Sequence, residues 1–157
     1  MKTLILYASK YGATKEIAQR IAQKIEKAEV RDLKQEDIPP IENFDCIILG
    51  SSIYAGSIRK EAKAFVAKNA GVLSEKMLGL FLTGLGENSS YFEKNFPQNL
   101  LTKAKATSFL EGIFDPQKAN AAERLIMKAA AKQSVYVNRI NEDAIDQFVG
   151  AIKGHHP

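Results

Sequence analysis

Short apolar runs alternate along this chain with longer segments whose apolar residues recur at helical spacing. Five of the short runs predict strands, at residues 3–7, 29–33, 45–51, 77–83 and 107–113. The runs at 45–51 and 77–83 are almost continuously apolar, which is typical of strands covered on both faces. The alternation therefore predicts an α/β fold with a central parallel sheet.

The intervening segments have the spacing of amphipathic helices. In the segment 15–27, one apolar face is formed by Ile17, Ala18, Ile21, Ala22 and Ile25. Further helices are predicted at 59–69, 89–96 with a continuation after Pro97, 115–132, and from Asn141 to Gly154. We expect Gly71 and Gly154 to end helices and Asn141 to cap the last one.

Right-handed crossovers between five parallel strands leave few topologies. The arrangement that fits is a doubly wound sheet of order 2-1-3-4-5 with helices on both faces, formed by one domain over residues 1–154 and followed by a short tail at 155–157. Ligands of such sheets bind at the carboxyl ends of the strands, where the strand order reverses between the first and third strands.

A hydroxyl-rich turn follows the first strand directly and leads into the first helix. It comprises Ser9, Lys10, Tyr11, Gly12, Ala13 and Thr14. Unpaired N–H groups and the macrodipole at a helix N-terminus favour a phosphate there, and a glycine lets the backbone approach it closely. The spacing is neither that of a P-loop nor the G-x-G-x-x-G pattern, so the turn suits one terminal phosphomonoester. An ordinary capped helix after an ordinary strand is the alternative.

Two further loops should meet this turn at the same edge of the sheet. The second loop comprises Ser51, Ser52, Ile53, Tyr54, Ala55 and Gly56, and the third comprises Thr83, Gly84, Leu85, Gly86 and Glu87. Their small residues leave room for a ligand and expose backbone hydrogen-bonding groups. Each also has a plainer interpretation, because Tyr54 can be an edge aromatic and the glycines can serve turns alone.

The pattern S/T-x-x-G-x-T after the first strand, formed by Ser9, Gly12 and Thr14, resembles the FMN-phosphate loop of flavodoxins. Tyr11 stands where that family usually has Thr or Asn. The resemblance implies a flavodoxin-like fold, an FMN cofactor whose phosphate lies in the first loop, and a flavin ring held by the second and third loops. Ile53, Tyr54 and Tyr11 are then candidates to pack against the ring.

A narrower resemblance is to the flavodoxin-domain family that includes the menaquinone-dependent protoporphyrinogen dehydrogenases. It is carried by the N-terminal strand and loop, by Gly50-x-Ser52-Ile53-x-x-Gly56, and by Leu125-Ile126-Met127-Lys128. It implies an FMN-dependent oxidoreductase that passes electrons to a quinone or another acceptor, with a porphyrinogen as a small-molecule substrate. The segment 84–113 is shorter than in the membrane-associated enzyme of that family. The alternative is a soluble electron-transfer flavodoxin that serves a redox partner protein.

Charge and composition narrow the classes of function. The net charge of +4 comes from lysines spread along the helices, so we expect no nucleic-acid partner. The same charge suits an acidic partner, a porphyrin carboxylate or peripheral contact with a membrane surface. A receiver-type signalling domain needs acidic residues after the first strand and at the end of the third. Those places hold Ala8-Ser9 and Gly50-Ser51, so the sequence argues against that class of protein.

The remaining chemistry-bearing residues are few. Cys46, the single cysteine, is expected in the core, and the two histidines, His155 and His156, lie in the tail without partners for a metal. We predict no metal site and no catalytic side chain. Residues 1–3 lead straight into a core strand and no apolar run reaches the roughly 20 residues of a membrane span, so we expect a cytoplasmic protein without a leader.

Overall fold

A parallel sheet forms the centre of the computed structural model, which describes residues 1–34, 37–84, 90–110, 113–114, 137–138 and 140–154. The strands are β1 (Thr3–Ala8), β2 (Ala28–Asp32), β3 (Cys46–Tyr54), β4 (Ser57–Ile58), β5 (Met77–Thr83), β6 (Ala106–Phe109), β7 (Ile113–Phe114) and β8 (Val137–Asn138). The helices are α1 (Ala13–Gln23), the 3-10 turn η1 (Ile41–Asn43), α2 (Lys60–Leu73), α3 (Ser90–Asn95), α4 (Gln98–Lys103) and α6 (Glu142–Lys153).

Five parallel strands run in the order β2-β1-β3-β5-β6, which confirms the predicted topology. The short β4 pairs antiparallel with the end of β3, and β7 pairs with β8 in a separate ribbon. The structure thus has the α/β architecture that the alternating pattern predicts.

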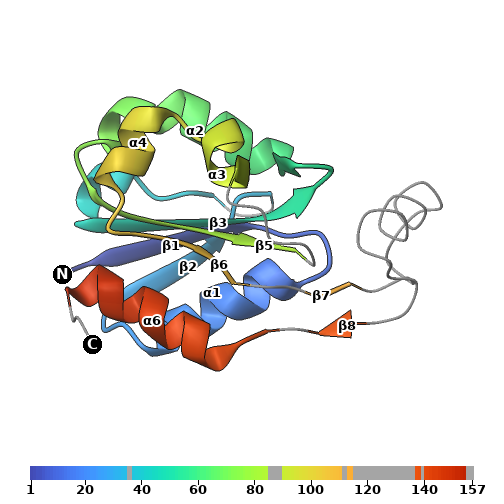
Figure 1. Cartoon of the computed structure of the whole chain (residues 1–157). Coiled ribbons are helices and arrows are strands. Elements are labelled where there is room, and N and C mark those ends of the chain that lie inside the picture. The colour runs from blue at the N-terminus through green and yellow to red at the C-terminus, as the bar shows by residue number, and fades with distance from the viewer. Residues whose placement is uncertain (35–36, 85–89, 111–112, 115–136, 139, 155–157) are drawn as a thin grey trace.

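Helices cover both faces of the sheet (Figure 1), with α2, α3 and α4 on one face and α1 and α6 on the other. The central strands are buried on both sides: Leu4, Leu6 and Ala8 of β1 join the core under α2, whereas Ile5 and Tyr7 join the core under α1 and α6. Continuous apolar sequence in the central strands follows from this double burial.

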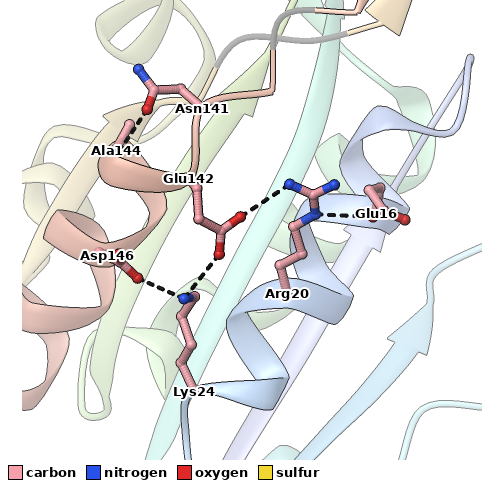
Figure 2. A network of polar contacts seen from close by, with 7 residues as sticks. All are labelled: Glu16, Arg20, Lys24, Asn141, Glu142, Ala144 and Asp146. Atoms are coloured by element: carbon pink, nitrogen blue, oxygen red, sulfur yellow. Dashed lines mark hydrogen bonds and ion pairs between the residues drawn. The ribbon is translucent and has the colours of Figure 1, made fainter.

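An ion-pair network fastens α6 to α1 (Figure 2). The Glu142 carboxylate accepts from Arg20 Nη1 at 3.0 Å and from Lys24 Nζ at 2.9 Å. Lys24 Nζ also contacts Asp146 Oδ1 at 2.6 Å, and Glu16 Oε1 lies 2.9 Å from Arg20 Nε. Because α1 begins at the loop after β1, this network also supports the helix on which the candidate site is built.

The predicted boundaries of two helices need correction. The helix predicted at 15–27 spans Ala13–Gln23, since tight i→i+3 bonds close its last turn and Lys27 adopts a positive φ of 57° before β2. Gly71 does not end α2, which continues to Leu73 with Ser74 at its C-cap. The predicted cap and stop of the last helix are confirmed, with Asn141 Oδ1 accepting from Ala144 N and Gly154 at φ +78°.

The predicted fifth strand, 107–113, is also too long. β6 ends at Phe109, and Ile113 lies in β7, where it pairs with Asn138. The helix predicted at 115–132, the segment 125–128 and the tail 155–157 lie outside the described residues.

Candidate functional site

Three chain segments meet at the carboxyl edge of the sheet. β1, β3 and β5 are direct neighbours, so the segments that follow them leave the sheet side by side. This is the edge at which the strand order reverses, because β2 lies to one side of β1 and the later strands to the other. The three predicted loops therefore begin at the same edge of the sheet.

The first loop leaves the N-terminus of α1 open. The Gly12 N–H donates to Ser9 Oγ at 3.0 Å, and Gly12 occupies the N-cap position with φ +92°. Among the described residues, a Cβ built on Gly12 would meet no atom within 4 Å, and no side chain caps the first turn. The N–H groups of that turn are therefore not satisfied by a side-chain cap, and such groups favour an anion. Lys10 and Tyr11 are partly buried and Ala13 is the buried first residue of α1.

Thr14 reaches across to the third strand of this edge. Its Oγ1 lies 2.9 Å from Thr83 Oγ1, and both side chains are buried. One of the two hydroxyl protons closes this contact, so the other O–H stays available to donate to a third group. The pair links the first loop to the end of β5 and can offer one buried O–H to a ligand.

Ser52 adds a third hydroxyl beside this pair. Ser52 and Thr83 are register partners on β3 and β5, so their side chains lie on the same face of the sheet, which is the face that α1 covers. Ser52 Oγ is buried and has no hydrogen-bond partner within the part of the chain that the structure describes. A buried hydroxyl without a hydrogen-bond partner costs about 1–3 kcal/mol of stability, so this position favours the binding of a polar group that can donate to it or accept from it.

The second predicted loop is mostly strand, which corrects the prediction. Ser51, Ser52, Ile53 and Tyr54 continue β3, and only Ala55 and Gly56 form a turn, which leads back into β4. Both turn residues have positive φ, 50° for Ala55 and 80° for Gly56, as a type I′ hairpin requires. The hairpin extends β3 beyond the edge of the sheet, with Ala55 exposed and Tyr54 partly buried.

Ser51 has a structural role that the sequence did not indicate. Its Oγ accepts from the Arg59 N–H at 2.9 Å, next to the start of α2, and donates to the Ser52 carbonyl at 3.0 Å. Ser51 lies on the opposite face from Ser52, against the core under α2. Its hydroxyl therefore supports the hairpin and α2 rather than the face that carries Thr14.

Two residues of α3 that were not predicted as site residues contact the hairpin. Asn95 forms hydrogen bonds with Gly56 and Ile58, and the Tyr91 ring lies 3.8 Å from where a Gly56 Cβ would be. An asparagine two residues before Pro97 is typical of an ordinary helix end, so only the tertiary structure reveals this contact.

Only part of the third predicted loop is described. Thr83 ends β5, and Gly84 packs so closely that an added Cβ would lie 3.3 Å from Phe109 Cζ and 3.9 Å from Ile53 Cβ. Leu85, Gly86 and Glu87 lie outside the described residues. Gly84 therefore joins the second and third segments of the edge through Ile53.

Other chemistry is limited within the described ranges. No group of three or more His, Cys, Asp or Glu residues there could hold a metal ion. Cys46 is buried, and this burial raises the pKa of its thiol to about 11, which keeps it protonated and unreactive near neutral pH. None of the helices in those ranges is both long and apolar enough to span a bilayer.

Comparison with known proteins finds a matching family model and a relative in sequence. A family model described as flavodoxin domain matches residues 4–141. Protoporphyrinogen IX dehydrogenase (quinone) of Escherichia coli strain K12 is 32% identical over 114 residues, which are 70% of this chain. The matched region spans 60% of the length of that relative.

Solved structures share the fold at low sequence identity. A flavodoxin from Streptococcus pneumoniae TIGR4 has a TM-score of 0.63 at 17% identity, covering 98% of this chain and 99% of its own. A Lactobacillus acidophilus flavoprotein in complex with FMN has a TM-score of 0.57 at 20% identity, covering 69% of this chain and 92% of its own. Together with the match over most of the sequence, these likenesses support one assignment: this chain belongs to the flavodoxin domain family.

Proposed function

We propose that this chain binds FMN at the carboxyl edge of its sheet and acts as an FMN-dependent oxidoreductase that passes electrons to a quinone or another acceptor. The observation that carries the proposal is the buried Thr14–Thr83 hydroxyl pair beside the open N-terminus of α1. FMN supplies one- and two-electron transfer when bound. The chain's own residues then have the tasks of holding the phosphate, placing the ring and excluding water.

The residues of the first loop fit a phosphate. Thr14 would donate its O–H, the first-turn N–H groups of α1 would donate from the backbone, and the space beside Gly12 would admit the phosphate oxygens. Ser9 accepts from Gly12 in the structure, so its own O–H proton is still available as a donor. Ser52 Oγ would find a partner among the polar atoms of a ligand.

The second and third segments suit a flat ring. Ile53 and Tyr54 are partly buried at the end of β3, and Tyr11 is partly buried on the first loop. The backbone of Ala55, Gly56 and Gly84 lies at the same edge and would offer donors and acceptors. The proposed site also includes residues of the three segments that surround the ligand, namely Lys10, Ala13 and Ser51. It further includes Leu85, Gly86 and Glu87, which lie outside the described residues.

An enzyme is favoured over a pure electron carrier by two observations. The relative from E. coli is by its name a dehydrogenase that uses a quinone, and this chain has a net charge of +4, which suits an anionic substrate or acceptor surface. We propose that the substrate is a porphyrinogen and the electron acceptor a quinone. We also propose that the protein is cytoplasmic and contacts a membrane surface peripherally. A flavodoxin-like carrier serving a redox partner protein is the second candidate, which the likeness in fold to flavodoxins favours.

The experiment has two stages. The FMN-free protein is titrated with FMN, and the quenching of flavin fluorescence reports binding. The signal should saturate at one FMN per chain, and an absence of quenching would contradict the proposal. The loaded protein is then mixed with protoporphyrinogen and a water-soluble quinone. Quinone reduction that depends on both the protein and the porphyrinogen supports the enzyme, whereas electron exchange only with a flavodoxin reductase supports the carrier.

A further inference from the structure

Asn95, the last residue of α3, holds the β3–β4 hairpin through both ends of its side-chain amide. Its Nδ2 donates to the Gly56 carbonyl at 2.9 Å and to the Tyr91 carbonyl at 2.7 Å. Its Oδ1 accepts from the Ile58 N–H at 3.1 Å. Since two partners are acceptors and one is a donor, only this orientation of the amide satisfies all three.

The hairpin depends on such support for physical reasons. β4 has only two residues and lies at an edge, and an isolated two-stranded hairpin is marginal in water. Ile58 is opposite Ile53 at a position whose N–H points away from β3, and in the described part of the chain this N–H donates to Asn95. The turn also contains Ala55 at φ +50°, which is costly for a residue with a side chain.

The second contact of α3 with the hairpin is apolar. The Tyr91 ring lies over Gly56, and Tyr91 packs against the core under α2. Asn95 and Tyr91 are one helical turn apart, so the same face of α3 supplies the hydrogen bonds and the ring. The turn at 55–56 is thereby fixed by a helix that belongs to a different part of the chain.

We propose that Asn95 is a positioning residue of the flavin site, which holds the Gly56 carbonyl and the Ile58 N–H so that the hairpin is already shaped to receive the ring. This inference rests on the proposed function, because it takes the ligand to be FMN. A loop that is ordered before binding loses less conformational entropy when the ligand binds, so Asn95 raises FMN affinity without touching the phosphate.

Three variants separate the contacts. Asn95→Asp keeps the size and the acceptor for Ile58 but removes the donors to Gly56 and Tyr91, whereas Asn95→Ala removes all three contacts. Asn69→Asp is the matched control. Asn69 lies on α2, and its Nδ2 also donates to the carbonyl four residues earlier, that of Phe65, at 2.9 Å. Within the described chain, Asn69 has no hydrogen bond to the hairpin.

Hydrogen exchange of the Ile58 amide in the FMN-free protein tests the contact itself. Exchange should become about tenfold faster in Asn95→Ala and stay within about threefold of the wild type in Asn95→Asp and Asn69→Asp. Unchanged exchange in Asn95→Ala would overturn the proposal. If Asn95→Ala does not fold, the affinity of Asn95→Asp decides the question.

FMN binding then tests the positioning role. The dissociation constant should rise about tenfold in Asn95→Asp and stay within about twofold in Asn69→Asp, and the visible circular dichroism of bound FMN should change only in the Asn95 variants. Wild-type affinity and an unchanged spectrum in Asn95→Asp would overturn the positioning role of Asn95 but would leave the proposed function intact. If the wild-type protein does not bind FMN, the proposed function fails and this inference with it.

Discussion

The hydroxyl oxygens of Thr14 and Thr83 lie 2.9 Å apart although 69 positions separate the two residues in the sequence. One residue stands in the first turn of α1 and the other ends β5, so the contact joins two of the three segments at the carboxyl edge. In the proposed site the pair presents one O–H to the phosphate, and Thr14, on the helix turn itself, is the residue that donates it.

Thr14→Val should therefore weaken FMN binding about 10- to 100-fold, because it removes a buried hydrogen bond to a charged group while keeping the shape of the side chain. Thr14→Ser, which keeps the hydroxyl, should stay within about threefold of the wild type. Thr83→Val leaves the Thr14 proton in place and should cost less than Thr14→Val. Fluorescence titration of the FMN-free variants measures all three, and a larger loss in Thr83→Val would contradict the assignment to Thr14.

Gly50 is required by the packing of the sheet, since a Cβ there would lie 2.0 Å from Phe81 Cζ on the neighbouring strand. Gly50→Ala should lower the free energy of unfolding by about 3 kcal/mol, and adding Phe81→Leu should restore part of the loss. Gly71→Ala is the control, because a Cβ inside α2 would meet no atom within 4 Å and should stabilise the helix by about 0.5–1 kcal/mol. Urea denaturation measures these changes, and an undiminished stability of Gly50→Ala would refute the packing argument.

Cys46 predicts a dependence of stability on alkaline pH. Burial raises the pKa of its thiol from 9.0 to about 11, so between these values the unfolded state loses a proton that the folded state keeps. Unfolding is then favoured as the pH rises, and the free energy of unfolding should fall, relative to Cys46→Ala, by up to about 3 kcal/mol between pH 8 and 11. Denaturation of both proteins across this range measures the difference, and parallel curves would contradict the buried thiol.

Glu142 predicts the opposite dependence at acidic pH. Its hydrogen bond with Lys24, followed by that with Arg20, lowers the pKa of its carboxyl group. The stabilisation is therefore present above the ordinary pKa of a glutamate and is lost as the pH falls through the lowered value. Glu142→Gln should be less stable than the wild type at pH 7, and the difference should shrink as the pH is lowered below the ordinary pKa of a glutamate.

The control for Glu142 is Glu26→Gln, at an exposed glutamate outside this network, which should show little difference across this pH range. Since the pairs are exposed, added salt should also reduce the difference at pH 7. A gap between Glu142→Gln and the wild type that does not shrink as the pH is lowered would show that the ion pairs are not its source.

Local signals in the sequence predicted the strand order, the first loop and the last helix, because each depends on apolar periodicity or on residues such as Gly12 and Asn141 that act within a few positions. The second loop was mispredicted because β3 continues through Ser51 and Ser52 by parallel pairing with β5, and through Ile53 and Tyr54 by hairpin pairing with β4. The two-residue turn of Ala55 and Gly56 also lacks the usual Asn-Gly signal. The contacts of Asn95 and Thr83 join residues that are far apart in the chain. No local pattern encodes such contacts, so they had to come from the structure.

The most direct test compares FMN with riboflavin, which lacks the phosphate but has the same ring. If the loop 9–14 holds the phosphate, the FMN-free protein should bind FMN at least about 100-fold more tightly than riboflavin, and Thr14→Val should reduce that ratio by weakening FMN alone. Equal dissociation constants for the two flavins would contradict the central claim.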